Sequence, residues 1–248
     1  MAGGLDLSSK SNGAGDAARR SIRPPLLWLA AGFVPVIFLV GWRVLLPPPA
    51  PTGVASGEQL APVVLWRLGL AAVVLGSVAA MAAFLHADRV SLLLLWPSRS
   101  VVVLSVVFAL VVGPLALWLG PILAQPFFGP VGFDVAPQGV TLTAFLAALV
   151  IALANGTLEE LTFRGALMGW GSRAVGPLGA NLLQAVVFGV VHVGSDFTGN
   201  PLPVMLAVGV GGLIAGVIAQ RTRSLLLPIA VHAAFDLPLY YAFACRLG

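Results

Sequence analysis

Seven long apolar runs follow one another along this chain of 248 residues and constrain its fold more than any other feature. They lie at residues 26–46, 61–85, 101–124, 140–156, 178–193, 202–219 and 225–243. A transmembrane helix needs about 20 apolar residues. Charged residues make up 9% of the chain, against about a quarter in an ordinary soluble domain. We therefore predict an all-α, polytopic transmembrane helical bundle with seven or eight spans.

The loops between these runs differ in charge. Basic residues occur in the N-terminal arm, in the 86–100 loop and at Arg173, Arg221 and Arg223. The loops at 47–59, 125–138 and 194–201 contain neither Lys nor Arg. Because cytoplasmic loops of membrane proteins are enriched in Lys and Arg, we predict a multi-pass protein of the cell membrane with a cytoplasmic N-terminus. The small positive excess then reports loop orientation, and we expect no nucleic-acid partner.

Five ionisable residues lie within or beside the apolar runs, where they are costly to bury. They are Glu159, Glu160, His192, His232 and Asp236. A charged side chain at the centre of a bilayer costs at least about 2.5–3.5 kcal/mol, so such residues mark functional sites by default. The whole chain has only three histidines and nine acidic residues. We take these five residues as the centre of the functional site.

The two adjacent glutamates have different neighbours in the sequence. Glu160 and Arg164 are four residues apart, so on a helix they share a face and can pair. Glu159 points about 100° away around the same helix and has no cation nearby in the sequence. We interpret Glu160 as a structural partner of Arg164 and Glu159 as an unpaired carboxylate available to act as a general base.

The histidines can reach a similar depth in the membrane. Glu159 and His192 lie roughly 21 Å and 22 Å from the basic ends of their helices, and His232 roughly 14 Å, at 1.5 Å per residue. Helix tilt can absorb the difference, so the groups can meet. The helix that carries Glu159 is too long for a bilayer. We expect it to protrude, tilt or bend, and the candidate position for a bend is Asn155-Gly156.

Three short motifs follow in order within residues 159–236. They are E-E-x-x-x-R from Glu159, F-x-x-x-H from Phe188 and H-x-x-x-D from His232. Together they resemble the motifs of the CAAX protease and bacteriocin-processing (CPBP/ABI) family, which contains the type II CAAX prenyl endopeptidases. The string E-E-L-T-F-R-G is typical of this family. We divide the chain into a disordered cytoplasmic arm (1–25), N-terminal transmembrane helices (26–138) and a catalytic CPBP-type transmembrane core (139–243).

The resemblance implies an intramembrane glutamate-dependent endopeptidase that needs neither cofactor nor metal. Its substrate would be a membrane-associated protein or peptide. Glu159 would activate water with help from His192, and His232 and Asp236 would stabilise the oxyanion. The supporting residues would be Glu160, Arg164 and Phe188. An ionised carboxylate accepts hydrogen bonds and cannot donate one to an oxyanion. Asp236 is therefore either protonated or serves to orient His232.

Other functions fit parts of the pattern. Glu159, His192, His232 and Asp236 could ligate zinc in a metal-dependent peptidase, although no H-E-x-x-H motif is present. Buried Glu, His and Asp residues also build proton relays in transporters, but no inverted repeat supports a transporter here. A non-catalytic partner-binding protein would be expected to lack a motif residue, and none is lost. Gly212 and Gly216 form a small-xxx-small face that predicts close helix packing.

Overall fold

The computed structural model describes residues 24–47, 60–128, 142–193 and 201–247. In these ranges the regular elements are helices joined by short connections, and the single strand-like pairing is one bridge between Leu94 and Ser224. The helices are α2 (Pro25–Leu45), α3 (Leu60–Leu85), α4 (Arg99–Phe128), α5 (Leu142–Glu160), the π-helix η2 (Leu161–Trp170), α6 (Gly171–Val191), α7 (Pro201–Thr222) and α8 (Leu226–Leu247). The all-α prediction is confirmed. Residues 1–23 of the predicted arm (1–25) lie outside the described residues.

Four helical stretches in the described part are long and apolar enough to cross a membrane. They are Pro25–Leu45, Ala61–Leu85, Phe145–Val191 and Pro201–Thr222. The shorter stretches Arg99–Val111 and Leu226–Pro238 are also apolar. The chain is thus a membrane protein, while the count of seven or eight spans stays a prediction.

Two runs that the sequence separates belong to one helical path. The path covers 47 residues, Phe145–Val191, and includes most of the predicted spans at 140–156 and 178–193. Its helices α5, η2 and α6 follow one another directly, and the non-helical backbone within α6 is at Gly176, with φ of 73°, before Pro177. Proline removes a backbone donor and clashes with the preceding turn, which explains a kink at this point.

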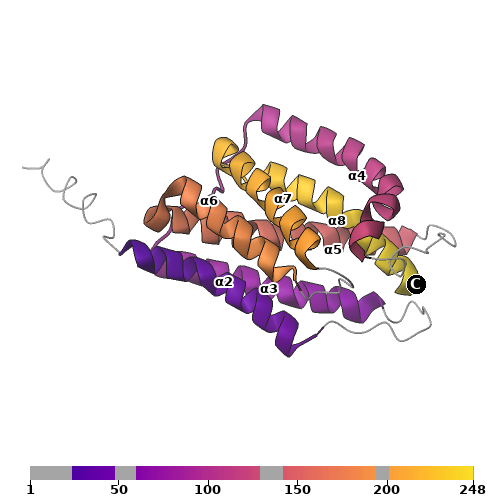
Figure 1. The fold of residues 1–248 in the computed structure, drawn as a ribbon, viewed down its shortest axis with the longest axis horizontal. Coiled ribbons are helices and arrows are strands. Elements are labelled where there is room, and N and C mark those ends of the chain that lie inside the picture. Colours follow the sequence, from indigo (N-terminus) through magenta and orange to yellow (C-terminus); the bar gives the residue numbers. More distant parts are fainter. Residues whose placement is uncertain (1–23, 48–59, 129–141, 194–200, 248) are drawn as a thin grey trace, which may run out of the picture.

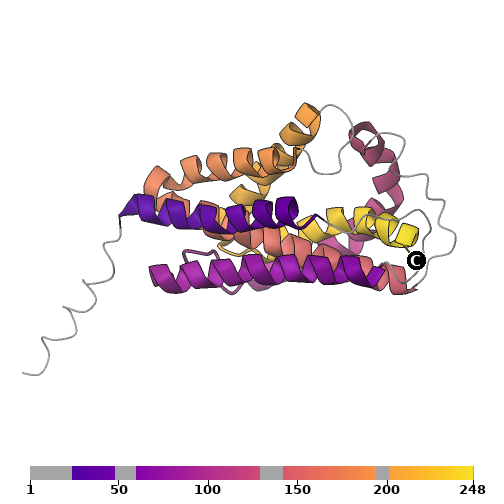
Figure 2. The same cartoon turned by 90° about the horizontal axis from the view of Figure 1, so that it is seen from below.

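The glutamate-bearing helix runs through the middle of the bundle. α5 and its continuation η2 contact α2, α3, α6 and α8, whereas α4 packs outside α8 and α7 packs on α6 (Figure 1). Seen after a 90° turn, α2 and α3 flank the α5–η2 path (Figure 2). A helix surrounded in this way can hold polar side chains away from lipid on several faces.

The change in helix geometry occurs later than we expected. α5 continues as an α-helix through Asn155 and Gly156 to Glu160, and the chain becomes a π-helix from Leu161. The predicted bend at Asn155 and Gly156 is therefore wrong. π-Helical turns are rare and are frequent at functional sites. Here the transition lies directly after the two glutamates.

Glycines allow the helices to approach each other closely at the central crossings. A side chain at Gly32 of α2 would meet the backbone of Leu167 in η2, and one at Gly156 would meet the backbone of α8. Added side chains at Gly212 and Gly216 of α7 would meet side chains of α6. The prediction of close packing at this pair of glycines is confirmed.

The basic segments gather at one end of the bundle. The Arg173 guanidinium lies over the Trp28 ring near the start of α2, with its Cζ 3.7 Å from the ring centroid. The Leu95 amide donates to the Arg223 carbonyl at 3.2 Å, joining the 86–98 connection to the α7–α8 turn. This clustering is what the cytoplasmic assignment of the basic loops requires. The orientation itself remains a prediction.

Candidate active site

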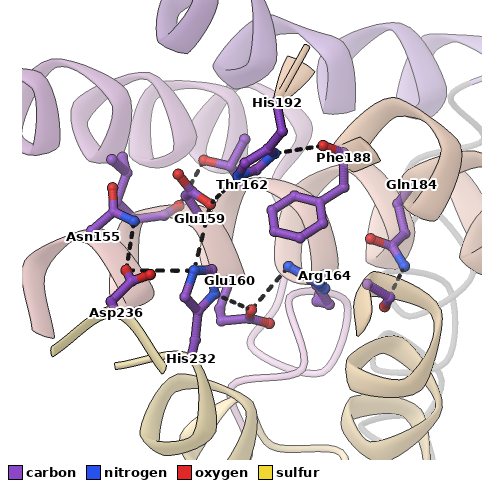
Figure 3. Close-up of polar contacts among 12 residues, drawn as sticks. Asn155, Glu159, Glu160, Thr162, Arg164, Gln184, Phe188, His192, His232 and Asp236 are labelled. Atoms are coloured by element: carbon purple, nitrogen blue, oxygen red, sulfur yellow. Dashed lines mark hydrogen bonds and ion pairs between the residues drawn. The ribbon is translucent and has the colours of Figure 1, made fainter. Parts of the chain in front are cut away.

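The structure brings all seven predicted site residues into one cluster (Figure 3). The cluster draws on the α5–η2 path, on the end of α6 and on α8. Its members are Glu159, Glu160, Arg164, Phe188, His192, His232 and Asp236.

The two oxygens of Glu159 have different surroundings. Oε2 lies 3.7 Å from Nε2 of His192 and 3.6 Å from Nε2 of His232. Oε1 accepts a hydrogen bond of 2.9 Å from Nη2 of Arg43. The Glu159 side chain is only 2% exposed. One oxygen is thus paired with a guanidinium, and the other faces two imidazoles.

The interpretation of Glu159 as an unpaired carboxylate is wrong. Its cation, Arg43, comes from α2 and is 116 residues away in the sequence, so helical spacing along α5 could not reveal it. Arg43 does share a helix face with Val36 and Leu39, both of which are buried. An arginine in register with an apolar buried stripe is a signal that sequence reasoning could have used.

Glu160 holds two donors on a single oxygen. Its Oε1 accepts from Nη1 of Arg164 at 2.9 Å and contacts Nδ1 of His232 at 2.8 Å. Both Glu160 and Arg164 are buried, with side chains only 1% exposed. The predicted pairing of Glu160 with Arg164 is confirmed, and the same carboxylate also fixes the His232 ring.

Asp236 is joined to a residue that we did not predict as part of the site. Nδ2 of Asn155 donates to Oδ2 of Asp236 at 2.8 Å, and Nε2 of His232 lies 3.6 Å from the same oxygen. Asn155 stands four residues before Glu159 on α5 and so shares its helix face. An amide within an apolar run, four residues before the glutamate, was a signal that the sequence already contained.

Phe188 is the aromatic wall of the site. Its ring centroid lies 4.6 Å from that of His192 and 6.0 Å from that of His232, and the Arg164 guanidinium carbon is 4.2 Å from the ring centroid. The Phe188 carbonyl contacts Nδ1 of His192 at 2.7 Å. A carbonyl can only accept, so Nδ1 of His192 carries the proton.

Two further buried amide side chains, Asn181 and Gln184, join the helices next to Arg164. Nε2 of Gln184 donates to the Gly212 carbonyl at 2.9 Å, and Nδ2 of Asn181 donates to the Leu213 carbonyl at 3.2 Å. These bonds tie α6 to α7. An added Cβ at Gly212 would lie 3.3 Å from Nη2 of Arg164, so the glycine leaves room for the guanidinium.

The cluster does not have the arrangement of a metal site. Within the described residues, no group of three or more His, Cys, Asp or Glu side chains is arranged to hold a metal ion. Arg43 adds a positive charge on Oε1 of Glu159, which opposes the binding of a second cation there.

Comparison with known families assigns the segment that carries this cluster. Residues 141–238 match the family model described as type II CAAX prenyl endopeptidase Rce1-like. The matched segment contains all three motifs. This segment is a domain of the CPBP/CAAX protease family. Neither a curated protein nor a solved structure matches the chain.

The family assignment has two consequences for this membrane protein. It implies a peptidase, and a protease in a membrane would act on a membrane-associated substrate. It also shows which part of the site lies outside the matched segment. Arg43 lies 98 residues before that segment begins (141 − 43), yet it contacts Glu159 directly.

Proposed function

We propose that the chain is an intramembrane, glutamate-dependent endopeptidase that hydrolyses peptide bonds of membrane-associated proteins or peptides. One observation carries the proposal. Oε2 of Glu159 is buried and lies within 3.7 Å of the Nε2 atoms of both His192 and His232. A carboxylate beside two imidazoles supplies a base and a proton donor to the same small volume, as peptide hydrolysis requires.

Glu159 and His192 are suited to activate water together. Since Nδ1 of His192 is engaged by the Phe188 carbonyl, Nε2 of the neutral ring is an acceptor. A water molecule beside Glu159 can then donate one hydrogen bond to Oε2 and the other to Nε2 of His192. Its lone pair is left to attack the peptide carbonyl. Glu159 takes the proton and later delivers it to the leaving amine.

His232 is suited to stabilise the oxyanion. Its Nδ1 faces the Glu160 carboxylate at 2.8 Å, and its Nε2 faces Glu159 and Asp236. In the doubly protonated ring, Nδ1 donates to Glu160 and Nε2 donates into the site. Arg164 fixes Glu160, so the ring is held before the negative charge develops. Donors that are positioned in advance are the usual source of transition-state stabilisation.

The role of Asp236 depends on its protonation. Oδ2 accepts the Asn155 amide, which suits a carboxylate that orients His232. A protonated Asp236 would instead present a hydroxyl donor to the oxyanion. Substitution by Asn separates these two roles, because Asn keeps an acceptor and adds a neutral donor.

The direct test is a comparison of wild type with Glu159→Gln, both purified and reconstituted in liposomes. The substrate would be a lipid-tethered, internally quenched peptide library, and product peptides would be identified by mass spectrometry. We expect Glu159→Gln to abolish cleavage while the protein still folds and inserts. Asp88→Asn is a matched carboxylate-to-amide control, since Asp88 caps the Ser91 amide away from the site. Wild-type turnover by Glu159→Gln would refute the assignment of the base.

A further inference from the structure

We propose that Arg43 is a positioning residue of the active site, which holds Oε1 of Glu159 so that Oε2 faces the attacking water. This inference rests on the proposed peptidase function. It also extends the active site to α2, outside the segment that matches the family model.

The packing of α2 places Arg43 against the site. Gly32, Val36, Leu39 and Arg43 are spaced by four, three and four residues, so they form one face of the helix. Gly32 lies against the backbone of η2, with an added Cβ 3.0 Å from Cα of Leu167. Val36 and Leu39 are buried in the core cluster that includes Phe163, Leu158 and Phe188. The next position on this face is Arg43, whose guanidinium reaches Glu159.

The contact selects one carboxylate oxygen. The two oxygens of a carboxylate are chemically equivalent until their surroundings differ. Here the 2.9 Å ion pair with Arg43 engages Oε1, and Oε2 has no hydrogen-bond partner among the described residues. A charge-assisted hydrogen bond of this length is strong and directional. Rotation of the carboxylate about χ3 would break it, so Arg43 fixes the oxygen that faces His192 and His232.

The docking of α2 does not depend on Arg43 alone. At the opposite end of this helix, Trp28 is buried and its ring is covered by the Arg173 guanidinium. Val36 and Leu39 bury apolar area between the two ends. The Arg43 side chain remains 22% exposed, whereas Glu159 is 2% exposed. This distribution fits an arginine that serves the carboxylate better than one that serves only to anchor the helix.

The test uses the full chain in liposomes, with the peptide substrate that the wild type cleaves in a Glu159-dependent manner. The variants are Arg43→Gln, Arg43→Lys and the control Arg173→Gln, which removes an arginine that anchors α2 away from the site. We expect Arg43→Gln to lower kcat by about 10²-fold, the scale of a small misplacement of a catalytic group, with KM changed by less than about threefold. Arg43→Lys should recover at least about tenfold of that loss, since the ammonium can still donate to Oε1.

The outcomes separate this inference from the proposed function. A kcat for Arg43→Gln within twofold of wild type, a loss confined to KM, or an equal loss in Arg173→Gln would overturn the role of Arg43. If Arg43→Gln does not fold, Arg43→Lys decides, because a folded lysine variant as inactive as Glu159→Gln also overturns it. A wild-type protein without Glu159-dependent cleavage would instead refute the peptidase function itself.

Discussion

Glu160 is engaged on one oxygen by two donors from different elements. Arg164 and His232 both contact Oε1, and all of these groups are buried or nearly so. We expect Glu160→Gln to reduce activity and to lower the free energy of unfolding. The loss should stay below the roughly 3–5 kcal/mol of a broken buried pair, because Gln keeps one acceptor. Thermal unfolding in detergent, measured beside kcat, checks this. Unchanged stability would contradict the structural role of the pair.

Asp236 allows the oxyanion hypothesis to be tested. We expect Asp236→Asn to keep substantial activity and Asp236→Leu to be inactive. Asn at this position can accept the Asn155 amide and still present its own amide to the site. Removing one oxyanion donor typically costs about 10²–10³ in rate, so the two variants should separate clearly when both are assayed in the same lipid. Asn as inactive as Leu would show that the negative charge itself is needed, and the oxyanion role would be wrong.

At the residue scale, a contact could be predicted from the sequence only when its two residues were a few positions apart in the chain. The Glu160–Arg164 pair is local, so its four-residue spacing predicted the contact. The contacts of Glu159 with Arg43 and of Asp236 with Asn155 join different helices. Spacing within one helix does not report such contacts, since they depend on how the helices are placed against each other.

At the element scale, the position of α8 against α5 sets the geometry of the site. These helices cross at Gly156, where an added Cβ would lie 3.3 Å from both the Ala233 nitrogen and the Ile229 oxygen, and 3.5 Å from Cβ of His232. A larger side chain must push α8 outward and carry His232 away from Glu159. The crossing therefore couples helix packing to the distance between Glu159 and His232.

We expect Gly156→Leu to lower kcat by at least tenfold and to destabilise the fold by about 1–3 kcal/mol, the usual cost of overpacking. Gly76→Leu is the matched control, because an added Cβ at Gly76 meets nothing within 4 Å. Activity and thermal unfolding would be measured for both variants. If Gly156→Leu behaved like Gly76→Leu, the α5–α8 crossing would not control the site.

The sequence predicted the helices better than the connections between them. The apolar runs predicted the ends of α2, α3, α7 and α8 to within a few residues. They could do so because a helix buried in lipid requires a continuous apolar sequence. The α5–η2–α6 path was divided into separate spans, because its central part carries polar residues. These polar residues are buried within the bundle. Hydropathy therefore drops in the middle of a path along which the helix continues.

At the scale of the whole molecule, a short family domain is completed by a helix from outside it. The matched segment supplies both glutamates, both histidines and Asp236, while α2 supplies a cation and part of the core around Phe163 and Phe188. The motifs predicted the first group, because these residues are themselves positions of the motifs. They carried no information on the second, whose place follows from packing of the entire bundle.

Metal dependence is also a property of the whole purified protein. It separates the metal-independent peptidase mechanism from the zinc-dependent one. We expect full activity after exhaustive chelation and no stoichiometric metal by elemental analysis. The reason is the Glu159 environment: a guanidinium 2.9 Å from Oε1 neutralises the carboxylate that a metal would need, and a bound cation would face this positive charge at short range. The control is Glu159→Gln carried through the same chelation and analysis. About one zinc ion per wild-type chain, lost together with activity and absent from Glu159→Gln, would establish Glu159 as a metal ligand and refute the metal-independent mechanism.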